Sequence, residues 1–132
     1  MATKKYTYGL GRRKSATATA RLYKGKGEIT INDKPALDYL SGNKTYLAEI
    51  TDPLALAGKQ KEYDITILVK GGGLAGQVDA IKLAISKALV TEAPDLRAVL
   101  KKAGFTSRDP REKERKKYGL RSARKKEQFS KR

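Results

Sequence analysis

Residues 71–76 read Gly-Gly-Gly-Leu-Ala-Gly and match the G-x-G-x-x-G pattern with which many proteins hold the phosphates of a dinucleotide. The segment follows an apolar, strand-like run and begins a helix-like one, as that fingerprint requires. The fingerprint also needs an acidic residue about 20 positions further on, at the end of the next strand. Here Glu92 and Asp95 fall between two predicted helices, and the chain is short for a two-halved nucleotide domain with a substrate site.

Two other interpretations of residues 71–76 stay open. The glycines can form a turn that lets a strand and a helix pack closely. Alternatively, a glycine-rich helix start offers unpaired backbone N–H groups and the positive end of the helix dipole, which suit a phosphate. A nucleic-acid backbone supplies phosphates as well as a cofactor does.

The sequence offers little else for catalysis. It contains no histidine and no cysteine, which removes the commonest general base, the commonest metal ligand, and all thiol and disulfide chemistry. The carboxylates are scattered, with no D-x-D or E-x-x-H arrangement. The residues therefore show no constellation for acid–base or metal chemistry, and a nucleotide-dependent enzyme built on residues 71–76 remains as a rival.

Charge is distributed very unevenly along the 132 residues. Residues 1–27 carry eight lysines or arginines and no acid, and residues 105–132 carry twelve against four acids. Residues 28–104 hold ten of each, so the whole formal net charge of +16 lies at the two ends. A neutral middle with two basic arms is typical of a protein that lies on a polyanion.

The first arm contains the run Arg12, Arg13 and Lys14, with no acid in its vicinity along the chain. Arginine side chains held at a strand turn can fork onto phosphate oxygens, although a solubilising surface loop is the alternative. Three tyrosines accompany this arm, and they can either stack on exposed bases or pack at the core or an edge. They are Tyr6, Tyr8 and Tyr23.

The second arm, residues 105–132, has basic clusters at short intervals and three apolar residues, Tyr118, Leu120 and Phe129, spaced among them. At about 3.3–3.6 Å per extended residue it can reach on the order of 90 Å. Residues 109–112 begin like a capping box and predict a short charged helix to about residue 119. Beyond residue 120 there is no packing face, so we expect disorder in the free protein.

The elements that must position these groups follow from periodicity. Alternation over residues 15–23 predicts a strand with one polar face, and the apolar run in 63–70 predicts a central strand buried on both faces. Residues 11–14 are predicted to form a basic turn or bulge, and residues 24–27 a turn. The other predicted strands are 6–10 and 28–31, and the predicted helices are 35–40, 44–56 interrupted at 52–53, 74–90 and 96–103.

No apolar stretch approaches the roughly 18 residues of a membrane span, and no secretory signal is visible. We expect one globular domain over residues 1–104, followed by a tail over 105–132. A reducing cytoplasm is the default compartment.

Several motifs in order resemble one family. They are Gly-Leu-Gly-Arg-Arg-Lys at residues 9–14, the glycine segment extended to Gln77, Asp-Pro-Arg-Glu-x-x-Arg-Lys-Lys at 109–117, and the ending Gln-Phe-Ser-Lys-Arg at 128–132. From about residue 6 to the end, the chain is similar to the bacterial-type small-subunit ribosomal protein nine family.

That resemblance implies an α+β fold with a mixed four-stranded sheet, helices on one face and a long extended basic tail. It implies a place in the head of the small ribosomal subunit, bound to ribosomal RNA beside neighbouring proteins, without a cofactor, catalysis, membrane or homo-oligomer. It also implies that Ser130, Lys131 and Arg132 approach the anticodon stem-loop of the peptidyl-site tRNA. The rival within the same chemistry is a general nucleic-acid-binding or RNA-chaperone protein.

The residues expected to bind ribosomal RNA are Lys4, Lys5, Arg12, Arg13, Lys14, Gly71, Gly72, Gly73, Arg111, Arg115, Lys116, Lys117, Arg121, Arg124, Lys125 and Lys126.

Overall fold

Strand β2 (Ala16–Lys24) follows directly from the alternation in its sequence. Its small and apolar residues are buried and the residues between them are half-buried, as a strand with one face on a core requires. β2 pairs antiparallel with β1 (Thr7–Arg13) on one side and with β5 (Tyr63–Lys70) on the other. The buried residues of β2 are Ala16, Ala18, Ala20 and Leu22.

The computed structural model describes residues 5–107 together with residues 111, 115 and 118. Its sheet is mixed and open, with strand order β1-β2-β5-β3-β4. β3 (Ile29–Ile31) runs parallel to β5, and β4 (Lys34–Pro35) pairs antiparallel with β3 at the edge. The α+β class with a mixed sheet is confirmed; the fifth strand is two residues long and contains a proline, which a pattern search does not detect.

β1 is longer than the sequence predicted. It continues through residues expected to form a turn or bulge, and Arg13 pairs with Ala16. The reversal is confined to Lys14 and Ser15, and Lys14 adopts a positive φ of 53°. Residues 12 and 13 therefore lie on a strand, where successive side chains point to opposite faces.

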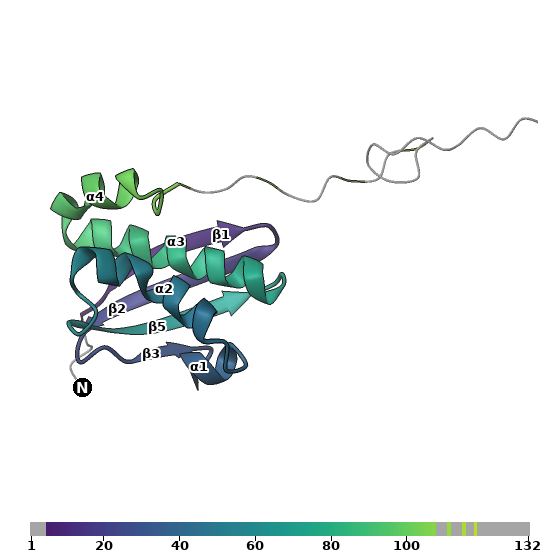
Figure 1. Ribbon diagram of the computed structural model, residues 1–132, viewed down its shortest axis with the longest axis horizontal. Helices are drawn as coiled ribbons and strands as arrows, with labels where there is room; N and C mark the ends of the chain where they lie inside the picture. The colour runs from purple at the N-terminus through teal and green to yellow at the C-terminus, as the bar shows by residue number, and fades with distance from the viewer. Residues whose placement is uncertain (1–4, 108–110, 112–114, 116–117, 119–132) are drawn as a thin grey trace, which may run out of the picture.

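Helices cover one face of this sheet (Figure 1). Helix α3 (Leu74–Glu92) packs on β1 and β2, and α2 (Lys44–Ala57) packs beside α3. The predicted three- and four-residue spacing is confirmed, because the spaced apolar residues of α3 face the core. Those fully buried are Val78, Ile81, Ile85 and Leu89.

β1 and α3 approach each other unusually closely. A Cβ atom built on Gly9 would lie 2.1 Å from the carbonyl oxygen of Ala84, and one on Gly11 would lie 2.0 Å from that of Ala80. Real Cβ atoms are not found at such distances, so both positions require glycine. Small residues on both elements thus set the depth at which the helix lies on the sheet.

The shorter helices complete the layer. They are α1 (Ala36–Tyr39) near β3 and β4, η1 (Pro94–Leu96), and α4 (Arg97–Lys102), which places Leu100 in the core. Asn43 caps α2, since its Oδ1 accepts hydrogen bonds from the backbone N–H groups of Thr45 and Tyr46 at 3.0 and 3.2 Å.

Two predictions about these elements were wrong. The helix over residues 44–56 is not interrupted, because Pro53 lies inside a continuous α2 and is buried with Leu54 against the core. β5 is central but buried on only one face, where Ile65, Ile67 and Val69 point to the helices. Its other face is accessible, and Leu68 is 45% exposed there.

The expected boundary at residue 104 falls just before Phe105, which is half-buried against the core. The charged helix expected over 109–119 and the expected disorder beyond 120 lie outside the described residues. Within residues 5–107, no helix has both the length and the apolar character needed to cross a lipid bilayer.

Candidate nucleic-acid interface

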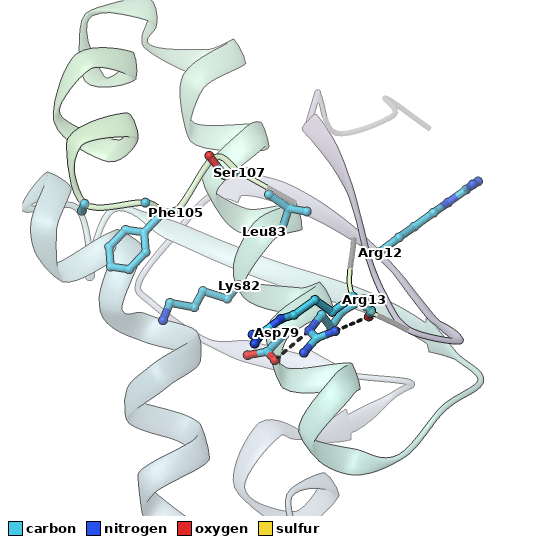
Figure 2. Close-up of a pocket in the computed structure, with 10 residues that line it drawn as sticks. Arg12, Arg13, Asp79, Lys82, Leu83, Phe105 and Ser107 are labelled. Carbon is cyan, nitrogen blue, oxygen red and sulfur yellow. Dashed lines mark hydrogen bonds and ion pairs between the residues drawn. The ribbon is translucent and has the colours of Figure 1, made fainter. Parts of the chain in front are cut away.

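The two adjacent arginines of β1 point to opposite faces of the sheet. Arg12 is exposed, whereas Arg13 shares its face with Gly9 and Gly11 and therefore points toward α3. Figure 2 shows Arg12 extending away from the body and Arg13 turned toward Asp79 on α3. The pair was predicted as one phosphate-binding cluster, but the two side chains have different surroundings.

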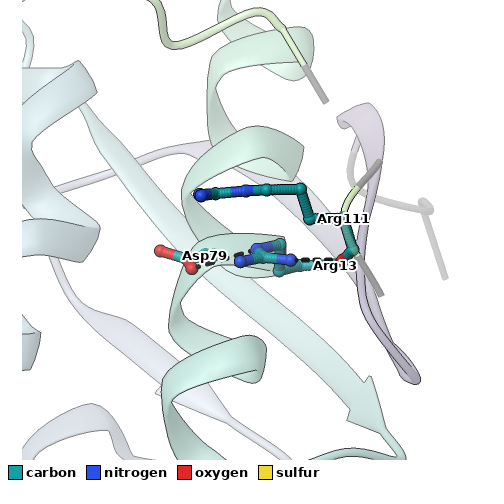
Figure 3. Close-up of polar contacts among 3 residues, drawn as sticks. All are labelled: Arg13, Asp79 and Arg111. Carbon is teal, nitrogen blue, oxygen red and sulfur yellow. Dashed lines mark hydrogen bonds and ion pairs between the residues drawn. The ribbon is translucent and has the colours of Figure 1, made fainter. Parts of the chain in front are cut away.

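Arg13 connects β1, α3 and residue 111. Its Nε lies 3.5 Å from Oδ2 of Asp79, and its Nη1 donates a hydrogen bond of 2.7 Å to the backbone carbonyl of Arg111 (Figure 3). The Arg13 side chain is 12% exposed and that of Asp79 is 50% exposed, so solvent still screens this ion pair in part. We refer to Arg13, Asp79 and the carbonyl of Arg111 as the clasp.

A polar cavity of about 350 Å³ lies at the clasp, between the end of β1, α3 and the segment that follows α4 (Figure 2). Lys82 contributes a second cation from α3, with its Nζ 4.8 Å from the centre of the Phe105 ring. Arg12 lines the cavity but its side chain extends away from it (Figure 2), and the three other cations outnumber the one carboxylate, so the potential of the cavity favours an anion. The charged lining residues are Arg12, Arg13, Asp79, Lys82 and Arg111.

The glycine segment lies against the β1–β2 turn. Gly71 and Gly72 have φ values of +74° and +69°, which side chains other than glycine rarely adopt. A Cβ on Gly71 would lie 2.6 Å from the carbonyl oxygen of Ser15. At these two positions, the structure supports the interpretation that the glycines allow a tight turn and close packing.

Gly73 differs from its two neighbours. It is the N-cap of α3, has an ordinary φ of −85°, and supplies no side chain to cap the helix. No atom lies within 4 Å of a Cβ built on it. The helix start is thus compatible with an anion, as the second interpretation requires.

The order of elements does not fit a dinucleotide site. After α3 the described chain continues through η1 and α4, and residues 93–107 contain no strand. The acidic residue of the fingerprint belongs at the end of such a strand. Among the described residues there is also no group of three carboxylates that could hold a metal ion.

Sequence reasoning missed two polar residues that fix the glycine segment. Gln77 donates from Nε2 to the carbonyl of Gly71 at 3.0 Å, and its Oε1 accepts a hydrogen bond from the hydroxyl of Tyr39 at 2.8 Å. It also missed Asp79 and Lys82, although their three-residue spacing on the polar side of the predicted helix was visible. Their partners became known only with the tertiary fold.

The structure brings part of the predicted site together. One end of the sheet collects the side chains of the β1–β2 hairpin, the glycine segment and residue 111, whereas Lys5 lies at the other end of β1. Arg115 is exposed. The predicted residues gathered at this basic end are Arg12, Arg13, Lys14, Gly71, Gly72, Gly73 and Arg111.

The remaining predicted site residues lie outside the described residues. They are Lys4, Lys116, Lys117, Arg121, Arg124, Lys125, Lys126, Ser130, Lys131 and Arg132.

A second cavity, of about 470 Å³, lies at the opposite end of the sheet and is lined by Lys5, Tyr6, Tyr63 and Glu92 among others. The hydroxyl of Thr7 donates a hydrogen bond to the Glu92 carboxylate. Burial, and secondly the negative charge of Glu92, raise the pKa of the Tyr63 phenol above its ordinary value. The lining of this cavity is more apolar than that of the clasp cavity.

Comparison with known proteins gives a consistent result. A family model described as ribosomal protein S9/S16 matches residues 11–132. The small ribosomal subunit protein uS9 of Synechococcus sp. (strain CC9311) is 52% identical over 95% of this chain and 93% of its own length. The protein named uS9c of Emiliania huxleyi is 49% identical over the whole of both chains. The uS9 protein of Solidesulfovibrio magneticus is 51% identical over 96% of this chain and 97% of its own.

Proposed function

Because the chain belongs to the ribosomal protein S9/S16 family, we propose that it is a structural constituent of the small ribosomal subunit, binds ribosomal RNA there and catalyses no reaction. The names of its relatives support this assignment. It then functions within the ribosome in the cytoplasm, in the subunit head and in contact with neighbouring ribosomal proteins.

The observation that carries the proposal is the basic end of the sheet. Arg12 and Lys14 are exposed there, and the clasp cavity beside them has an excess of positive charge. Guanidinium groups form paired hydrogen bonds with phosphate oxygens, and each phosphate that is neutralised releases counterions from the RNA. Residues 1–104 therefore bind the RNA through the basic end of the sheet, and the glycine segment and the start of α3 lie close to the same phosphates.

The tail, residues 105–132, forms the second contact. It continues from the clasp, which holds its early part at the basic end through the carbonyl of Arg111. We propose that the basic residues of the tail bind ribosomal RNA, and that Ser130, Lys131 and Arg132 reach the peptidyl-site tRNA. In this arrangement residues 1–104 bind the RNA by shape and charge, and the tail extends the contact beyond them.

The first experiment is sedimentation of a cell lysate through a sucrose gradient at raised salt, with detection of this chain. The protein is expected to travel with the small subunit. A protein that remains at the top of the gradient contradicts the ribosomal assignment. In that case a general RNA-binding or chaperone role becomes the better interpretation.

Affinities for two RNAs, measured over a range of salt concentrations, distinguish specific binding from attraction to any polyanion. If ten phosphates are neutralised, the slope of log K against log salt concentration should be about −7 to −9, depending on the RNA form. Binding to folded small-subunit RNA should exceed binding to an unrelated RNA of equal length at every salt concentration. Equal affinity for both RNAs would favour the general nucleic-acid binder.

The tRNA contact is tested by changing only the end of the chain. Deletion of residues 130–132 should leave subunit assembly intact and weaken tRNA binding at the peptidyl site. A matched variant, Lys131→Gln with Arg132→Gln, keeps the length of the tail and removes the two charges. It therefore distinguishes the effect of tail length from the effect of charge. Unchanged tRNA affinity and reading-frame fidelity in both variants would contradict a role for the terminus.

A further inference from the structure

The face of the sheet opposite the helices carries a surface that the fold does not use. Side chains alternate between the two faces along β1, β2 and β5, so every second residue points to this face. No helix among the described residues covers it (Figure 1). Tyr8 is 54% exposed on this face. We call this surface the open face; it is formed by Tyr8, Leu10, Arg12, Thr17, Thr19, Arg21, Tyr23, Thr30, Asp64, Thr66, Leu68 and Lys70.

The strand register orders these side chains into rows. Tyr8 is opposite Arg21, and Arg21 is opposite Thr66 on β5. Four residues further along β1, Arg12 is in the same row as Lys70 through the intervening β2 residue. At about 3.3 Å per residue the two rows are roughly 13 Å apart. One end of the open face is thus aromatic and the other end cationic.

An aromatic cluster borders the first row. The ring centres of Tyr6 and Tyr23 are 5.4 Å apart with an interplanar angle of 49°, and Cζ of Arg21 lies 5.1 Å from the centre of the Tyr6 ring. The cluster lines a cavity of about 650 Å³ on the open face. This volume lies within the range of roughly 300–1,000 Å³ that is usual for small-ligand sites.

The charge of the open face favours a polyanion. Two carboxylates, those of Glu28 and Asp64, border the cavity. Oδ1 of Asp64 accepts hydrogen bonds from the backbone N–H groups of residues 26–28, in the turn after β2, at 2.9–3.0 Å. That carboxylate therefore stabilises a loop, while Arg12, Arg21 and Lys70 supply positive charge. An aliphatic protein helix would find only Leu10 and Leu68 here.

Threonine hydroxyls add polar capacity to the same surface. Thr17, Thr19, Thr30 and Thr66 are half-buried on it. In the part of the chain that the structure describes, their hydroxyls make no hydrogen bond. Such groups suit a ligand with many donors and acceptors, which an RNA base and its 2′-hydroxyl provide.

We propose that the open face binds unpaired nucleotides of an RNA strand. Tyr8 and the cluster of Tyr6, Arg21 and Tyr23 stack on bases, and Arg12 and Lys70 hold phosphates. Aromatic side chains on an exposed sheet, with cations beside them, are the elements with which proteins bind single-stranded nucleic acid. The inference rests on the proposed RNA-binding function and adds a second surface, which shares only Arg12 with the lining of the clasp cavity.

The first test measures binding of the full chain to a short oligoadenylate and to a blunt RNA duplex of equal length. Tyr8→Ala should weaken single-strand binding about 5- to 150-fold, which corresponds to stacking energies on the order of 1–3 kcal/mol. The slope of log K against log salt should not change, because no phosphate contact is lost. Lys70→Ala should reduce the magnitude of that slope by about 0.7.

Two control variants make this test selective. Tyr8→Phe keeps the ring and should bind as the unchanged protein does. Leu56→Ala removes an exposed apolar side chain from α2, in the helical layer, and should have no effect. Wild-type affinity of Tyr8→Ala, or an equal loss on the duplex, would overturn the inference.

The second test identifies the partner in intact subunits. Tyr8 is replaced by the photo-crosslinker p-benzoylphenylalanine, small subunits are purified and irradiated, and the adduct is analysed, with the same replacement at Leu56 as control. An RNA adduct that forms from position 8 and not from position 56 is expected. A protein adduct alone, or no adduct from subunits that contain the variant, would overturn the inference and leave the proposed function intact. Absence of the unmodified chain from small subunits would instead contradict the proposed function.

Discussion

Substitution of Gly11 by alanine tests the contact between β1 and α3 on which the basic end depends. The added Cβ would lie 2.0 Å from the carbonyl oxygen of Ala80 and 2.6 Å from the backbone nitrogen of Ala84. Both atoms belong to the main chain in the interior of α3, so no side-chain rotation relieves the clash. The helix must move outward by about 1 Å to reach the 3.0 Å below which Cβ contacts are essentially not observed.

The magnitude follows from that displacement. Overpacking in a core costs about 1–3 kcal/mol and occasionally more. Since the whole of α3 must shift, we expect a loss of about 3 kcal/mol, which is a large fraction of a typical total of roughly 5–15 kcal/mol. At about 4–8 °C per kcal/mol for a domain of this size, the melting temperature should fall by roughly 12–24 °C.

The assay is thermal unfolding of the full chain followed by circular dichroism. Gly76→Ala is the matched control, because a Cβ there would meet its nearest neighbour, the Arg13 carbonyl oxygen, at an ordinary 3.6 Å. Gly76 lies within α3, where alanine is favoured over glycine by roughly 0.5–1 kcal/mol, so this variant should be slightly stabilised. A melting temperature for Gly11→Ala within 2–3 °C of the unchanged protein, on the same roughly 4–8 °C scale, would refute the close approach of strand and helix.

Three further outcomes are expected. Asp64→Ala should destabilise the fold by about 1–3 kcal/mol in urea unfolding, because three backbone N–H groups lose their acceptor; an unchanged midpoint would contradict this. Because the folded-state pKa of Tyr63 is raised, its contribution to stability is complete below the unfolded pKa of about 10 and is lost as pH rises through the folded value. Tyr63→Phe should therefore show a smaller alkaline loss of stability, and parallel pH profiles would count against it. Arg13→Ala removes the ion pair and the hydrogen bond of the clasp, so trypsin should cleave after Arg111 faster than in Arg12→Ala, as measured by mass spectrometry; equal rates would mean that the clasp does not hold the chain.

Local patterns predicted the elements whose environment is repetitive. The alternation around Ala18 and Ala20 predicted β2 and its buried face, and the spacing of Val78, Ile81 and Ile85 predicted α3. In each case the element packs on a continuous surface, so each buried residue along it has a similar environment. The spacing of the apolar residues is then enough to predict the element.

The elements that were mispredicted depend on particular tertiary contacts. Glycine has a low propensity for strands, so Gly11 indicated the end of one. β1 nevertheless continues through Gly11, because α3 packs there too closely for any residue with a side chain. Pro53 interrupts a helix in isolation, and α2 continues through it because its buried surface packs on the core. The apolar run of β5 predicted burial on both faces, but Leu68 is exposed since no described helix lies over it.

The candidate site was predictable in composition and not in geometry. The acid-free run at residues 12–14 indicated a polyanion-binding patch, and those residues do lie at one end of the sheet with the glycine segment. If the strand had been predicted to extend to residue 13, alternation would have placed Arg12 and Arg13 on opposite faces of the sheet. The pairing of Arg13 with Asp79 joins positions far apart in the chain and required the fold.

The clasp recognises residue 111 through a main-chain carbonyl, an atom that every amino acid possesses. This hydrogen bond therefore does not depend on which side chain occupies that position. Replacing Arg111 by almost any residue leaves the acceptor in place, whereas any loss of the guanidinium at residue 13 removes the donor. The segment that follows residue 111 can therefore differ between species, or be replaced in an engineered protein by a segment of different chemistry. In either case the chain would still leave the domain at the same point on its surface.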